Sequence, residues 1–179
     1  MKALQRAMAA AMASHTFSEA AEWPTAKTRR NNHQQVLPAK IKSHFGASLA
    51  GKTIAVWGLA FKPRTDDIRE APALVLIESL LAAGADVRVH DPEALPNVHR
   101  IYGQRLAYCD RPYGALEQAD ALAVATEWNE FRNPDFEVMR RLMRQPVIFD
   151  GRNVYEPARM AALGFTYHGI GRAGGAEPS

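Results

Sequence analysis

The chain has 179 residues, 47% of them hydrophobic and 23% charged, which suits one globular domain with an arm and excludes a collagen-like, low-complexity or disordered chain. The net charge is +3, and the basic excess lies in residues 1–50, which hold seven Lys or Arg and two Glu. These basic residues do not cluster on one face, so the pattern favours a solvated arm and argues against a nucleic-acid partner. A single cysteine, Cys109, excludes an internal disulfide, and no run approaches the roughly 18 apolar residues of a membrane span, so we expect a cytoplasmic protein without a membrane partner.

The first fifty residues predict a helical arm. The start is rich in Ala and Met, a composition typical of a plain helix and not of a secretory signal. Residues 1–30 show no clean period and predict a poorly defined helical or linker arm. Residues 31–45 carry an apolar stripe at helical spacing, which predicts a helix that ends at Gly46. The stripe consists of Val36, Leu37, Ile41 and Phe45. We expect it to be exposed and to drive self-association.

After Gly51 the pattern changes to short apolar runs that alternate with helical segments. Strands are predicted at 53–57, 87–90, 106–109, 121–125, 146–149 and 165–168, and helices at 73–83, 112–119, 135–143 and 157–163. This alternation predicts an α/β fold: a Rossmann-like parallel sheet of five to six strands with helices on both faces, preceded by the helical arm. Residues 51–172 form the predicted domain, and residues 173–179 a flexible tail.

Ligands of such sheets bind beyond the carboxyl ends of the strands. Residues 58–70 follow the first strand, but the glycine pattern of a dinucleotide turn is absent, because Ala60 stands where a second glycine would follow Gly58. Side chains must then bind any phosphate, and Lys62, Arg64 and Arg69 are the candidates. The alternative is a solvated loop whose cations pair with its own acidic residues, which are Asp66, Asp67 and Glu70.

Two later strand ends carry further polar residues. Arg152 follows a strand and a Gly turn, where it can grip a phosphate or carboxylate and share a crevice with Lys62; the alternative is that it pairs with Asp150. Thr126 and Glu127 could hydrogen-bond a ligand, while Trp128 is interpreted as packing.

The other polar candidates favour structural interpretations. The six histidines show no metal-ligand spacing, so no metal site is assigned. Cys109 lacks the sequence context of a nucleophile and is interpreted as packing. Asp91 ends the second strand, where dinucleotide enzymes place a ribose-binding acid, but Asp-Pro is also a turn signal, and the turn is preferred.

Residues 58–72 (GLAFKPRTDDIREAP) resemble the signature of the C-terminal, UDP-binding domain of the UDP-glucose/GDP-mannose dehydrogenase family, and of its bacterial UDP-glucose 6-dehydrogenases in particular. The likeness covers about residues 31–172 and continues through several ordered motifs. These are His90-Asp-Pro92, Thr126-Glu-Trp128, Phe131, Phe149-Asp-Gly-Arg-Asn153 and Gly169-Ile-Gly171.

The resemblance implies a role in a three-part enzyme. In this family an N-terminal domain holds NAD, a long central helix forms the dimer, and the C-terminal domain clamps the UDP end of the sugar nucleotide. These enzymes oxidise UDP-glucose to UDP-glucuronate, a precursor in polysaccharide biosynthesis, through intermediates on a cysteine. By motif match, Phe61, Lys62 and Arg152 are implied to bind substrate, and Arg69 to reach NAD. Residues 31–50 resemble a remnant of the central helix.

The sequence also departs from the family. The NAD fingerprint and the segment that bears the nucleophilic cysteine are absent from these residues, and Cys109 does not match that segment, so no catalytic residue is assigned. We therefore expect a truncated chain, inactive alone, that binds UDP-glucose or UDP-glucuronate and forms a homodimer or associates with a separate catalytic half. The alternatives are a stand-alone nucleotide-binding module and a dimerising fragment without chemistry.

Overall fold

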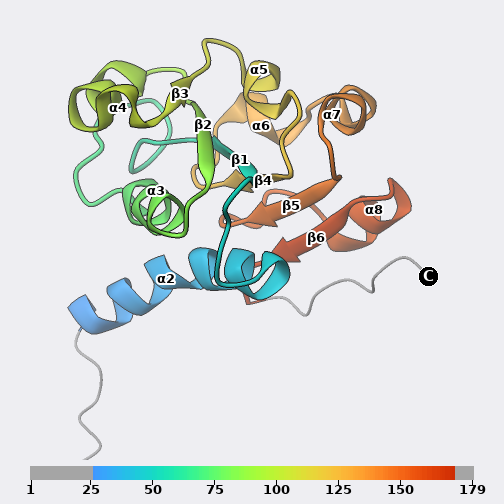
Figure 1. Cartoon of the computed structure of the whole chain (residues 1–179), viewed down its shortest axis with the longest axis horizontal. Helices are drawn as coiled ribbons and strands as arrows, with labels where there is room; N and C mark the ends of the chain where they lie inside the picture. The colour runs from blue at the N-terminus through green and yellow to red at the C-terminus, as the bar shows by residue number, and fades with distance from the viewer. Residues whose placement is uncertain (1–25, 172–179) are drawn as a thin grey trace, which may run out of the picture. The chain divides into compact units, whose positions relative to one another are not determined.

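Six short apolar segments form a single parallel sheet in the order β3-β2-β1-β4-β5-β6 (Figure 1). The strands are β1 (Thr53–Trp57), β2 (Asp86–His90), β3 (Ala107–Tyr108), β4 (Ala121–Val124), β5 (Val147–Asp150) and β6 (Thr166–Gly169). The strand order reverses between β1 and β4, which is where a crevice opens at the carboxyl edge of such sheets. The predicted Rossmann-like fold is confirmed.

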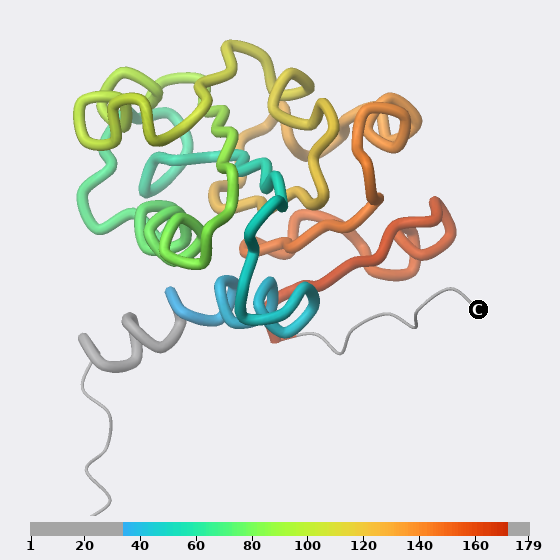
Figure 2. The backbone as a smooth tube through the Cα atoms, in the orientation of Figure 1, coloured from blue at the N-terminus to red at the C-terminus, as the bar shows by residue number. Residues whose placement is uncertain are grey.

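The computed structural model describes the backbone of residues 26–171 and the side chains of residues 34–171, the coloured part of the tube in Figure 2. The chain divides into two units, Met1–Asn31 and Asn32–Ser179. Predictions that concern residues 1–25 and 172–179 lie outside the described residues. Within the described part, no helix is both long and apolar enough to span a bilayer.

The helices follow the predicted alternation, with two additions. They are α2 (Ala26–Phe45), α3 (Pro72–Ala82), α4 (Leu95–Tyr102), α5 (Pro112–Leu116), α6 (Asn129–Arg132), α7 (Phe136–Leu142) and α8 (Pro157–Ala162), with the 3₁₀ turn η1 (Gly103–Arg105). The sequence did not predict α4 and α6, and α2 begins at Ala26 instead of Asn31. Both missed helices are short, and each buries only one or two side chains, so neither shows a full apolar period.

Successive residues of each strand supply two separate cores. In β1, Ile54 and Val56 face a cluster that includes side chains of α2, α3 and α4, while Ala55 and Trp57 face one built from α5, α6, α7 and α8. Strands buried on both faces have continuous apolar sequences, because both the odd and the even positions are covered. This explains why the runs at 53–57, 121–125 and 146–149 were recognisable as strands.

The apolar stripe of α2 lies inside the first core. Leu37 is 6% exposed and Ile41 is fully buried, and Phe45 packs against the same cluster. The expectation that the stripe is exposed is therefore wrong for Leu37 and Ile41, because the chain covers this helix face with its own sheet, while Val36 and Phe45 are half-buried. Self-association stays a prediction.

Candidate functional site

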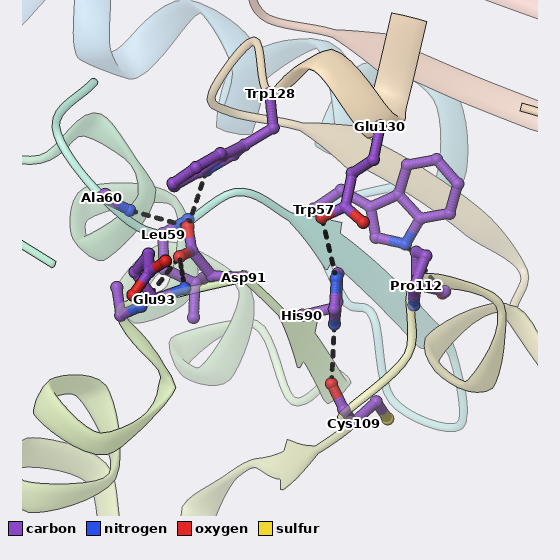
Figure 3. A network of polar contacts seen from close by, with 11 residues as sticks. Trp57, Leu59, Ala60, His90, Asp91, Glu93, Cys109, Pro112, Trp128 and Glu130 are labelled. Atoms are coloured by element: carbon purple, nitrogen blue, oxygen red, sulfur yellow. Dashed lines mark hydrogen bonds and ion pairs between the residues drawn. The ribbon is translucent and has the colours of Figure 1, made fainter. Parts of the chain in front are cut away.

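A buried carboxylate at the end of β2 organises the carboxyl edge of the sheet. Asp91 is 1% exposed, and five N–H groups donate to its two oxygens (Figure 3). The donors are the backbone N–H groups of Leu59, Ala60, Glu93 and Ala94 and the indole Nε1 of Trp128, at 2.7, 3.1, 2.9, 2.8 and 3.1 Å. One side chain thus joins the loops that follow β1, β2 and β4. The turn interpretation of Asp91 is confirmed, as is the packing of Trp128.

In this arrangement the backbone N–H groups and the acid that a dinucleotide-binding turn needs are already bonded to each other. In such a turn, backbone N–H groups after the first strand face the diphosphate, and an acid after the second strand binds the ribose. Here the N–H groups of Leu59 and Ala60 donate to Asp91 itself. The crevice between β1 and β4 therefore offers neither the cradle nor the acid to a dinucleotide.

The loops after β1 and β4 are also in direct contact. Gly58 has a φ of +85°, and a Cβ at this position would lie 2.6 Å from the Cβ of Thr126. The hydroxyl of Thr126 donates to the carbonyl oxygen of Ala60 at 2.6 Å. The expectation that Thr126 binds a ligand is wrong, because its side chain is buried and its hydroxyl joins these two loops.

A second buried carboxylate fixes the backbone at Arg152. Asp150, fully buried at the end of β5, accepts the N–H of Arg152 at 2.9 Å through Oδ1. Its Oδ2 accepts the N–H of Tyr155 at 3.0 Å and the hydroxyl of Tyr167 at 2.9 Å. The turn that carries Arg152 is therefore held from inside the domain.

The guanidinium of Arg152 pairs with Glu127 and not with Asp150. Nη2 donates to Oε1 of Glu127 at 2.7 Å, and Nε donates to Oε2. This hydrogen-bonded pair lowers the pKa of Glu127 below its usual value. Nη1 takes no part in the pair, so one edge of the planar guanidinium is directed away from Glu127.

A cavity of about 300 Å³ opens beside this pair. Its lining consists of Glu127, Arg132, Gly151, Arg152, Asn153, Val154 and Ile170. Asn153 has a φ of +52°, and its side-chain amide bonds both the carbonyl oxygen and the N–H of Ile170, at 2.9 and 3.0 Å. These two hydrogen bonds fix the Asn153 side chain and hold the loop that lines the cavity against the end of β6.

Phe61 and Lys62 lie on the surface of the loop between β1 and α3. Phe61 is 48% exposed although its backbone is fixed by an N–H bond to the carbonyl oxygen of Asp67 at 2.8 Å. The same loop holds Arg64 and Glu70 at φ values of +64° and +55°. Lys62 is exposed and does not line the Arg152 cavity. The convergence of Lys62 and Arg152 on one ligand thus stays a prediction.

Arg69 pairs within its own loop. Its Nε and Nη2 donate to the two carboxylate oxygens of Asp67 at 2.9 and 2.8 Å, which lowers the pKa of Asp67 to about 2. The Arg69 side chain is 87% exposed and borders a separate hollow of about 460 Å³. The local-pairing alternative is confirmed for Arg69, and its role toward NAD stays a prediction.

Cys109 belongs to the packing of the domain. It is partly buried against the second core, and burial raises the pKa of its thiol. Its carbonyl oxygen lies 2.8 Å from Nδ1 of the buried His90, whose Nε2 lies 3.3 Å from Glu130 (Figure 3). A raised pKa reduces the thiolate fraction, so this cysteine is poorly suited to act as a nucleophile.

The model of the UDP-binding domain of the UDP-glucose/GDP-mannose dehydrogenase family matches residues 55–157. The chain belongs to this family. The UDP-glucose 6-dehydrogenase of Pseudomonas aeruginosa is 50% identical over 151 residues, which cover 82% of this chain and 33% of the relative. That of Rhizobium meliloti is 40% identical over 142 residues, 79% of this chain and 32% of the relative.

Solved structures agree with the family. The UDP-glucose dehydrogenase of Pyrobaculum islandicum matches with a TM-score of 0.67 at 30% identity, over 80% of this chain and 30% of that one. The chain thus spans about a third of the length of these relatives. Phe61, Lys62, Arg69 and Arg152 all lie inside the range that the family model matches.

Sequence reasoning missed two features of this family domain. It did not identify Asp91 as the acceptor that joins three loops. The signal for this role is its position directly after β2, which places a polar side chain at the carboxyl edge of the sheet. It also did not pair Glu127 with Arg152. The signal for that pair is topological: both follow strands that are neighbours in the sheet.

Proposed function

We propose that this domain binds the UDP part of a UDP-sugar at the carboxyl edge of its sheet. Phe61, Lys62 and Arg152 are the proposed contacts. In this proposal the domain is the nucleotide-binding part of a UDP-glucose 6-dehydrogenase, which oxidises UDP-glucose to UDP-glucuronate with NAD. In this proposal the chain forms a homodimer or associates with a separate catalytic half, and the NAD site and the nucleophile come from outside these residues.

The observation that carries the proposal is the fixed position of Arg152. Its backbone is held by the buried Asp150, and its Nε and Nη2 are held by Glu127. The remaining edge of the guanidinium, formed by Nη1 and Nη2, can donate two parallel hydrogen bonds to one acceptor group. Because the side chain is already held in one rotamer, it loses little entropy on binding, and such preorganisation favours affinity.

The exposed residues suit the rest of a nucleotide. Lys62 supplies a compact positive charge for a phosphate oxygen, and Phe61 supplies an aromatic face that a base or a sugar can cover. Both stand on a loop whose backbone is fixed by the Phe61–Asp67 bond and by two left-handed residues.

The residues present do not fit a complete NAD site. The N–H groups of Leu59 and Ala60 are bonded to Asp91, and the Arg69 guanidinium is bonded to Asp67. For Arg69 we therefore propose only a contact to a cofactor that is held outside these residues. Cys109, with its raised thiol pKa, is assigned no part in the oxidation.

Calorimetric titration of UDP into the full chain tests the proposal. We expect Arg152→Ala to weaken binding by about ten- to a hundredfold, because a charge-assisted hydrogen bond contributes about 1.5–3 kcal/mol. Lys62→Ala should also weaken binding. Arg141→Ala removes the same charge in the last turn of α7, which leads into the amino end of β5, and should leave binding unchanged. Cys109→Ser should also bind like the wild type.

Equal binding by wild type and both site variants, each shown to be folded, would contradict the assignment of Lys62 and Arg152. The absence of any UDP binding by the folded chain would contradict the proposed function itself.

A further inference from the structure

Arg132 contributes a second guanidinium group to the cavity beside Arg152. It is the last residue of α6, and it lines this cavity of about 300 Å³ together with Arg152 and Glu127. Its side chain is exposed, and within the part of the chain that the structure describes its guanidinium has no hydrogen bond or ion pair. The donors of this group are therefore available to a ligand.

The backbone at Arg132 is held by the residue that precedes it. Phe131 is fully buried and stacks on Trp57, with ring centroids 5.0 Å apart and 24° between the planes. The carbonyl oxygen of Phe131 accepts the hydroxyl of Tyr155 at 2.6 Å. Arg152 likewise stands on a turn that a buried carboxylate fixes. Both arginines of the cavity thus start from a backbone that the core holds in place, which reduces the entropy lost on binding.

The lining of the cavity carries more positive than negative charge. It holds two guanidinium groups but one carboxylate, Glu127, and this carboxylate is already bonded to Nε and Nη2 of Arg152. The hydrogen bonds from Arg152 are the main cause of the lowered pKa of Glu127, and the charge of Arg132 lowers it further. Asp150 lies behind the turn, but its oxygens already accept three donors. The charge of Arg132 is left for an anion.

Two guanidinium groups in one cavity match a ligand with two anionic groups. In a nucleoside diphosphate sugar, each phosphate carries a negative charge and oxygens that accept paired N–H groups of an arginine. We propose that this cavity holds the diphosphate, with Arg152 bonded to one phosphate and Arg132 to the other. The inference rests on the proposed binding of UDP and adds a residue to it. Lys62 does not line this cavity, so the second phosphate needs a cation of its own here.

Calorimetric titration of UDP, UMP and inorganic pyrophosphate into the full chain tests the role of Arg132. We expect the wild type to bind UDP more tightly than UMP. Arg132→Ala should weaken the binding of UDP and of pyrophosphate by about tenfold, the lower end for a hydrogen bond to a charged group, because Arg132 is exposed. UMP has a single phosphate, which Arg152 can still bind, so its affinity should fall much less.

Two further variants separate the possible causes of such a loss. Arg132→Lys keeps the positive charge but lacks the planar fork, so it should restore part of the affinity for UDP. Arg141→Ala is the matched control: it removes the same charge at an exposed position of α7, outside the cavity lining, and should bind all three ligands like the wild type. UDP carries no sugar, so an effect on UDP also distinguishes a phosphate contact from a contact to the carboxylate of UDP-glucuronate.

Equal binding of UDP by the wild type and by Arg132→Ala, shown to be folded by circular dichroism, would overturn this inference and leave the proposed function intact. Equal affinities of the wild type for UDP and UMP would overturn it as well. If the wild type binds pyrophosphate, and Arg132→Ala weakens that binding, but UDP does not bind, the proposed function is wrong and the diphosphate site stands.

Discussion

Replacement of Asp91 by Asn changes one atom at the centre of the carboxyl edge. Asp91 accepts five N–H groups, three at Oδ2 and two at Oδ1. An Asn side chain keeps one acceptor oxygen and replaces the other by an NH₂ donor. The least unfavourable orientation leaves the oxygen at the triple site and turns the NH₂ toward the N–H groups of Glu93 and Ala94.

The loss can be worked out from these contacts. Two hydrogen bonds to a charged acceptor disappear, at about 1.5–3 kcal/mol each, and three others weaken from charged to neutral. We expect the free energy of unfolding of Asp91→Asn to fall by about 3–6 kcal/mol. This is a large part of the roughly 5–15 kcal/mol that stabilises an ordinary domain.

Equilibrium unfolding in urea, followed by circular dichroism and by tryptophan fluorescence, measures this difference. The matched control is Asp86→Asn, the same chemical change at an exposed position of β2, which should alter stability by no more than about 0.5 kcal/mol. A loss below about 1 kcal/mol in Asp91→Asn would show that the five bonds do not act together, and would refute the reasoning.

Three further changes test other parts of the structure. Pairing with Arg152 lowers the pKa of Glu127, so the pair stabilises the fold above about pH 4.3, and this contribution is lost as the pH falls through the lowered pKa. In Glu127→Gln, the free energy of unfolding, measured in urea at a series of pH values, should therefore depend less on pH in this range. Gly58→Ala should lower the melting temperature clearly more than Gly46→Ala. Both glycines have a positive φ, which disfavours Ala by about 1–2 kcal/mol, but only at Gly58 does the new Cβ also clash, since a Cβ at Gly46 meets nothing within 4 Å. Burial raises the pKa of the Cys109 thiol, so iodoacetamide should alkylate the native chain several-fold more slowly than the urea-unfolded chain; equal rates would contradict this.

The sheet could be predicted because its strands are buried on both faces. The apolar runs of β1, β4 and β5 are continuous, and each ends at a polar or Gly residue. Helix α4 gave no such signal: Pro96 lies in its first turn, and Val98 and Tyr102 are its buried residues. The burial of Leu37 and Ile41 could not be anticipated either, because amphipathic spacing does not tell which surface covers the stripe.

The sequence identified the basic side chains of the candidate site, but it did not identify the acidic side chain that pairs with Arg152. Arg152 stood out because it follows a strand and a glycine, yet its neighbour in sequence, Asp150, bonds its backbone while Glu127 bonds its side chain. Local spacing identifies residues at one edge of a sheet, whereas pairing depends on which strands are adjacent.

The parallel order of the strands has a consequence for how the chain assembles. Thr53 and Asp120 exchange hydrogen bonds of 2.9 and 2.7 Å across 67 positions, where β1 meets β4. Parallel neighbours cannot form through a tight hairpin, so β1 gains its second partner only after the intervening crossovers have been synthesised. Such distant pairing slows folding. During translation, the apolar β1 therefore keeps one edge unpaired until β4 leaves the ribosome, and an unpaired strand edge makes the nascent chain prone to aggregate in this interval.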